Sequence, residues 1–230
     1  MGVALDLFQR NAFSVSVDRP SGHTHGGRVR YAFLVETYAT ERIKVLSTWA
    51  TFRDEDLPVR PHPSDQRGRS VLEHMVHQCV SENLWFRDML GIDVGAPPLP
   101  QPETRLEFIR RYAADSGQRL TRLRGEAEAW WETEVRFFEV PRTRAWIVVR
   151  RIAHTAHHRG QQTELLRMLN RSLYSTYGPT ADTGGLMQQK APTVYAYADE
   201  SDLLVGEAAG GRKAALPGTG DRPVTERPVA

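Results

Sequence analysis

The sequence predicts an all-α protein, a four-helix bundle with irregular extensions at both ends. Apolar residues recur at helical spacing in four segments, each segment is long enough for a bundle helix, and irregular stretches separate them. We place the bundle at residues 29–172, an amino-terminal extension at residues 1–28 and an irregular tail at residues 173–230. The end of the tail is rich in Gly, Ala, Pro and charge, and we expect it to be disordered.

The first helix is expected from about residue 30 to residue 52. Leu34, Tyr38, Val45, Trp49 and Phe52 follow one another at spacings of four, seven, four and three. Trp49 and Phe52 are interpreted as exposed aromatic residues on this helix. These two residues lead us to expect a homodimer.

The second helix is predicted from Ser70 to about Leu90, ending near Gly91, and a proline-rich connection follows at residues 95–102. The third helix is expected over residues 103–127. Residues 130–140 form an aromatic-rich crossing over the bundle end, with only weak strand-like alternation. The fourth helix covers about residues 144–170. In the tail, residues 192–197 are expected to pack on the bundle as an extended strap.

Composition narrows the class of protein. With 230 residues the chain can form one sizeable domain, and its net charge of +2 gives no reason to expect nucleic acid or an anionic membrane as a partner. A single cysteine, Cys79, excludes an internal disulfide and fits a reducing compartment, and we interpret it as a packed thiol. No apolar run reaches the ~18 residues of a membrane span, so a soluble, cytoplasmic protein is expected.

Two short histidine clusters carry the functional signal. His154 and His158 are four residues apart, so on a helix they project from the same face, on the stripe that carries Ile147 and Leu165. Two neutral imidazoles on adjacent turns of an interior face suit a divalent transition metal. The alternative is a pair of hydrogen-bonded core histidines.

The second cluster lies on the second predicted helix, which carries His74 and His77. One more histidine on a facing helix would complete a three-nitrogen site with metal positions open to water or substrate, as catalytic metals require. Taken alone, both could be solvated helix residues. By contrast, His23 and His25 lie in a turn-rich segment at residues 20–27 and are interpreted as part of a mobile loop.

The sequence lacks the signature motifs of several other common classes of enzyme. The glycine-rich signatures of dinucleotide and P-loop sites are absent, and so is the GxSxG motif of α/β-hydrolases. The zincin HExxH motif and the repeated Glu-x-x-His of di-iron bundles are absent too.

The histidine segments resemble the DinB family, also called the DinB/YfiT-like metalloenzyme superfamily, over about residues 30–170. The segment from His154 to Gln161 matches the family signature His-x-x-His-His-Arg-Gly-Gln. The segment from Ser70 to Trp85 is similar to the family's second helix and aligns its ligand with His77, with His74 as the competing assignment.

This resemblance implies an up-down-down-up four-helix bundle and a divalent metal, Zn, Ni, Fe or Mn, held by His77, His154 and His158. The site and the resemblance together leave three alternatives for function. The first is a transferase that joins a low-molecular-weight thiol (bacillithiol, mycothiol or glutathione) to a small electrophile. The second is a hydrolase using water at the same site. The third is non-enzymatic: a stress-related bundle that binds metal or a small ligand, or that has kept the site only as structure. The family name records damage-inducible expression, which says nothing about mechanism.

Four further side chains near the motifs receive roles. Glu82 is a candidate general base or partner of a metal ligand, with a surface acid as the alternative. His157 is expected to pack or hydrogen-bond beside the site. Arg159 and Gln161 are expected to brace the helix or the ligand rings.

Overall fold

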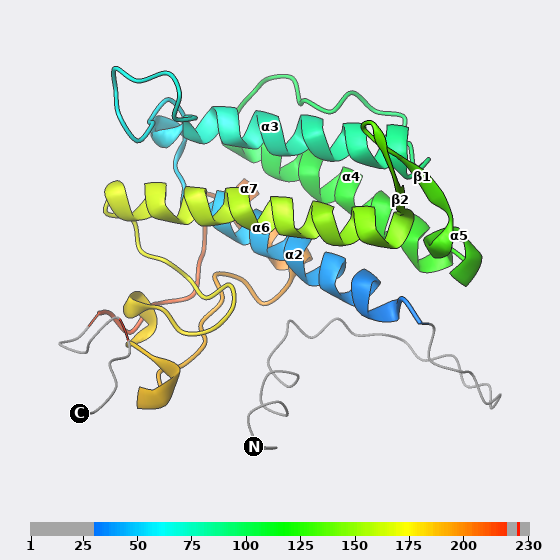
Figure 1. The fold of residues 1–230 in the computed structure, drawn as a ribbon. Helices are drawn as coiled ribbons and strands as arrows, with labels where there is room; N and C mark the ends of the chain where they lie inside the picture. Colours follow the sequence, from blue (N-terminus) through cyan, green and yellow to red (C-terminus); the bar gives the residue numbers. More distant parts are fainter. Residues whose placement is uncertain (1–29, 220–224, 226–230) are drawn as a thin grey trace.

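The computed structural model describes residues 30–219 and residue 225. The predicted extension at residues 1–28, with His23 and His25, and nearly all of residues 220–230 lie outside this range. The described chain is mostly helical. Four long helices lie side by side (Figure 1), and their bounds are α2 (Ala32–Thr51), α3 (Val71–Leu84), α4 (Arg105–Gly125) and α6 (Arg144–Met168).

Contacts between the helices define their directions. The helices α2 and α6 are parallel, because Glu41 pairs with Arg159 and Trp49 bonds to Gln162. The helices α3 and α4 are parallel to each other and run against α2 and α6 (Figure 1). The long connection at residues 90–104, which runs back along the length of the molecule, makes this order feasible.

Local signals explain where α3 begins. The Ser70 hydroxyl accepts a hydrogen bond from the backbone N–H of Glu73 (3.2 Å), and the Glu73 carboxylate accepts one from the backbone N–H of Ser70 (2.7 Å). This reciprocal capping satisfies two N–H groups that a helix start leaves unpaired. The far end differs from the prediction: the α-helix ends at Leu84 and continues as a π-helix, Trp85–Met89, before Gly91 turns the chain at φ +69°.

The prediction of an all-α protein is wrong at one place. After the short helix α5 (Glu128–Glu132), strands β1 (Glu134–Phe137) and β2 (Val140–Thr143) form an antiparallel hairpin at the end of the helices (Figure 1). Val135 and Phe137 alternate toward the partly buried face and pack on the core, so the weak alternation of the aromatic segment was a genuine strand signal.

Trp49 and Phe52 are buried, at 0% and 2% exposure, so their interpretation as exposed residues is wrong. The reason is that α2 is covered on two sides: Trp49 contacts Tyr112 of α4 and donates its indole N–H to Gln162 of α6 (3.2 Å). The homodimer stays a prediction, without the support of these two residues.

The tail contains regular structure that the sequence did not predict. Helix α7 (Glu200–Ala208) is tied to α2 by an ion pair between Arg42 and Glu200 (2.5 Å). The segment at residues 192–197 packs as the expected strap, with Ala196 and Tyr197 buried in the same hydrophobic cluster as Trp49. None of the described helices is long and apolar enough to cross a bilayer.

Candidate metal centre

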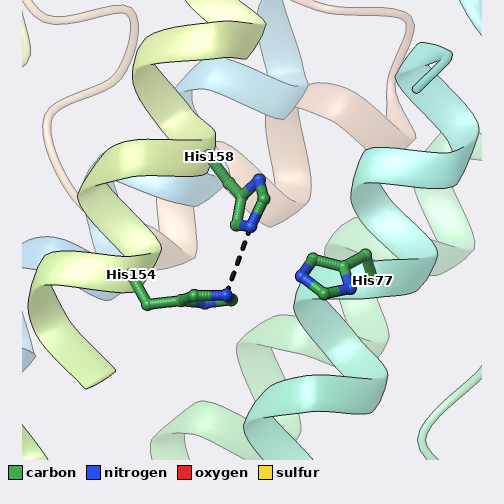
Figure 2. Close-up of side chains that lie close together, drawn as sticks. All are labelled: His77, His154 and His158. Atoms are coloured by element: carbon green, nitrogen blue, oxygen red, sulfur yellow. Dashed lines mark hydrogen bonds between the residues drawn. The ribbon is translucent and has the colours of Figure 1, made fainter. Parts of the chain in front are cut away.

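Three histidines from two helices meet between α3 and α6. Nitrogen atoms of His77, His154 and His158 all lie within 4.8 Å of one another. Figure 2 shows the two α6 imidazoles turned toward His77 on α3, with His154 Nε2 and His158 Nε2 3.3 Å apart. The i, i+4 spacing stacks the α6 pair, and the antiparallel packing of α3 brings the third ring opposite them. The arrangement can supply three nitrogen ligands to one cation.

The hydrogen bond of His158 defines its tautomer. His158 Nδ1 lies 2.9 Å from Gln161 Oε1, and an amide oxygen can only accept, so Nδ1 carries the proton. The lone pair of the neutral ring is then on Nε2, which faces His154. Fixing a ring by a hydrogen bond to its other nitrogen is the usual way in which proteins orient a histidine ligand. Gln161 therefore braces a ligand ring, one of the two roles expected for it.

All three imidazoles are held in the neutral form that metals require. Burial, followed by the charge of Arg151, lowers the pKa of His154 to about 3. Burial, followed by the neighbouring His77, lowers the pKa of His158 to about 4. The pKa of His77 is lowered by burial and then by Arg69. At neutral pH none of the rings carries the second proton, which a cation would have to displace.

His74, the competing third ligand, lies deeper in the protein. It is 4% exposed, and its ring centroid is 5.5 Å from that of His158. Its nitrogens do not belong to the group that lies within 4.8 Å, and its Nδ1 has no hydrogen-bond partner among the described residues. The described geometry thus brings His77, and not His74, together with the α6 pair.

A pocket opens onto this cluster from solvent. It has a volume of about 320 Å³ and is lined by Arg150, His154, His157 and His158. His157 is exposed and packs its ring 4.9 Å from that of His158, as expected for a residue beside the site. The exposed guanidinium of Arg150 adds a positive charge at the pocket. A small anionic molecule could therefore approach the imidazoles.

Glu82 is fully buried, so its interpretation as a surface acid is wrong. Its carboxylate accepts hydrogen bonds from Tyr38 (2.6 Å) and Tyr112 (3.1 Å) and pairs with Arg119 (3.5 Å) and Arg151 (3.7 Å). Both oxygens are occupied by these groups, which leaves a general-base role without support. The four partners come from α2, α4 and α6, and one sequence cannot show that they converge.

Arg151 links this buried cluster to the histidines, and sequence reasoning missed it. Its guanidinium donates to Ser81 (2.9 Å) and Thr155 (3.1 Å) and lies 5.6 Å from the centre of the Trp85 ring. Trp85 in turn packs against His154, with 5.5 Å between ring centroids. An available signal was the position of Arg151 one turn before His154, on the buried side of the helix.

Arg159 points away from the histidines although it belongs to the same motif. It pairs with Glu41 of α2 (2.5 Å) and donates to the hydroxyl of Tyr177, while Lys44 lies 3.8 Å from the centre of the Tyr177 ring. It therefore braces α6 against α2 and the tail. Cys79 is buried and free, and burial raises the pKa of its thiol, consistent with the prediction of a packed thiol.

A mostly helical protein with three clustered histidines belongs to the class of candidate metalloproteins. The family model of the DinB family matches residues 30–190, and the chain belongs to that family. Among solved structures, it is similar to the crystal structure of a DinB-like protein from Bacillus cereus ATCC 10987. The two share 17% identity with a TM-score of 0.55, over 62% of this chain and 94% of that chain, a likeness of fold alone. No curated protein matches the chain.

Proposed function

We propose that the protein binds one divalent metal ion, Zn, Ni, Fe or Mn, through His77, His154 and His158. The convergence of their nitrogens within 4.8 Å is the observation that carries this proposal. The donor set fits, because the rings are neutral and the Nε2 lone pair of His158 faces the cluster. The helix directions support the up-down-down-up four-helix bundle of this family as the scaffold.

The proposed activity is transfer of a low-molecular-weight thiol to a small electrophile. A bound divalent ion would lower the pKa of a thiol at this site. The sulfur forms a bond to the electrophilic carbon, and the bond from that carbon to the leaving atom breaks with its electron pair going to that atom. A halide then departs and the thiol proton passes to solvent, whereas an epoxide oxygen stays attached and takes up a proton. Arg150 supports this reaction by offering an anionic thiol, such as bacillithiol or glutathione, an ion pair beside the histidines.

Metal content tests the site directly. We expect one metal per chain in the protein as purified, and its loss when His77, His154 or His158 is replaced by Ala. His62→Ala is the matched control, because His62 is exposed and lies on a loop away from the cluster, where it contacts Ser64. Unchanged metal in His154→Ala and His158→Ala would overturn the site. Loss in His74→Ala with retention in His77→Ala would make His74 the third ligand.

Turnover separates the reaction classes. The metal-loaded protein is incubated with alkyl halides and epoxides, with and without bacillithiol, mycothiol or glutathione, and products are identified by mass spectrometry. We expect thioether products that require both the thiol and His154. Hydrolysed products formed without thiol would instead favour the hydrolase. Full metal content with no turnover would favour the non-enzymatic metal-binding protein.

A further inference from the structure

Four aromatic rings form a patch that reaches the histidine cluster through Trp85, which packs against His154. They belong to the π-helix, the hairpin and the start of α6, and we call them the hairpin patch: Trp85, Phe137, Phe138 and Trp146. Phe137 contacts the other three, with ring centroids 5.1 Å from Trp85, 4.8 Å from Phe138 and 5.1 Å from Trp146. Phe138 and Trp146 are 60% and 40% exposed, so the patch presents aromatic surface to solvent.

The backbone at Phe138 is unfavourable for a bulky residue. It occupies the first position of the two-residue hairpin turn at φ +52°, where Gly, Asn or Asp is usual. A non-glycine residue is disfavoured in this region, because its Cβ comes too close to the following carbonyl oxygen. The strained turn holds the Phe138 ring 6.3 Å from Trp85 while leaving most of it open. Such strain occurs preferentially at binding and catalytic sites.

Two residues of the hairpin patch connect it to residues that line the histidine pocket. Trp85 packs against both phenylalanines and also against His154, at 5.5 Å and an interplanar angle of 32°. On α6, Trp146 lies one turn before Arg150, which lines the pocket, so both project from the same face. Aromatic surface, positive charge and imidazoles therefore follow one another along α6.

We propose that the hairpin patch binds a planar aromatic part of the electrophilic substrate, with Phe138 and Trp146 as specificity-determining residues. This inference rests on the proposed function and adds the substrate class. A small planar molecule is the favoured occupant because Trp85 contacts His154 and Trp146 lies one turn from Arg150, and both His154 and Arg150 line a pocket of about 320 Å³, a volume typical of small-molecule sites. Exposed rings at the patch can form offset or edge contacts with it.

A pair of probes that differ in one ring tests this inference by binding alone. S-benzyl-N-acetylcysteine and S-methyl-N-acetylcysteine share a carboxylate and a thioether, and calorimetry measures both against the full chain as purified. We expect about tenfold tighter binding of the benzyl probe, the ratio that corresponds to ~1.4 kcal/mol of ring contact. Phe138→Asn, a residue suited to the turn, should abolish this ratio, whereas Arg150→Gln should weaken both probes alike.

The control is Phe33→Ala, since Phe33 is 58% exposed on α2 and no ring contact among the described residues joins it to the patch. It should leave the ratio unchanged. Equal affinity for the two probes, or an unchanged ratio in Phe138→Asn, would overturn the inference. If the two probes bind equally and Phe138→Asn also has a smaller molecular mass by light scattering than the unmodified protein, the patch would instead be assigned to contact with a second copy of the chain. The expected affinity ratio of the two probes, found in a protein that transfers no thiol, would contradict the proposed transferase activity and leave the aromatic binding site standing.

Discussion

Replacing Glu82 by Gln should destabilise the protein more than a single hydrogen bond would suggest. The substitution keeps the shape of the side chain and removes one negative charge from the interior. Arg119 and Arg151, 2% and 1% exposed in their side chains, would keep their positive charges at 3.5 Å and 3.7 Å from the altered group. Water cannot screen them at this depth.

Magnitudes follow from these contacts. Removing one partner from a buried ion pair costs about 3–5 kcal/mol. Hydrogen bonds to a charged acceptor are worth about 1.5–3 kcal/mol each, and Glu82 accepts two, from Tyr38 and Tyr112. The terms share one carboxylate and do not add, and the amide oxygen of Gln retains part of the bond to Tyr38. We expect a loss of about 3–5 kcal/mol from the free energy of unfolding.

Urea denaturation of the chelator-treated protein at pH 7.5 measures this loss without a contribution from metal. Glu139→Gln is the control: it also removes one carboxylate, but from a pair with Arg136 in which both side chains are at least 75% exposed. Its midpoint should match that of the unmodified protein. A loss of less than about 1 kcal/mol in Glu82→Gln, the range of surface pairs, would refute the reasoning.

Two further predictions concern the histidines. In chelator-treated protein, the folded-state pKa values of His154 (about 3) and His158 (about 4) lie below the unfolded value of ~6.5, so acid drives protons onto the unfolded chain. The melting temperature should therefore fall from pH 6.5 toward pH 4, less steeply in a variant with both residues replaced by Ala; equal slopes would contradict this. Gln161→Leu should weaken metal binding by about 10–100-fold in a chelator competition, whereas Gln161→Glu, which keeps an acceptor for His158 Nδ1, should not. Equal affinity of the Leu variant would exclude the bracing role.

Much of the helical structure could be predicted from the sequence, because it depends on local signals. The apolar spacing and the Ser70 cap placed both ends of α2, α4 and α6, and the start of α3, within a few residues of their observed bounds, whereas α3 ends at Leu84 and not at the predicted Leu90. The hairpin was not predicted, because its strands are four residues long and its turn carries Phe138 instead of a turn-forming residue. The π-helix and α7 had no recognised signal.

In the candidate site, too, the features that depend on local spacing could be predicted and those that depend on helix packing could not. Spacing within one helix sufficed to place His154 and His158 on one face. The third histidine could not be chosen from spacing, because His74 and His77 are less than a turn apart and both contact His158, and the rotation of α3 decides which of them brings a nitrogen to the cluster. The interpretation of Glu82 as a surface acid was wrong for a related reason, because the exposure of a helical acid depends on the other helices that cover it.

The rotation of α3 is set by two polar rows on that helix. His74, Gln78 and Glu82, at i, i+4 and i+8, are at most 4% exposed, whereas His77 and Ser81 are only partly buried. Arg151, one turn before His154 on α6, contacts both rows: it pairs with Glu82 of the first row and donates a hydrogen bond to Ser81 of the second. A rotation of α3 that brought His74 toward the pocket would separate Glu82 from its buried arginine partners. The same contacts that make Glu82 important for stability therefore hold His77 opposite His154 and His158.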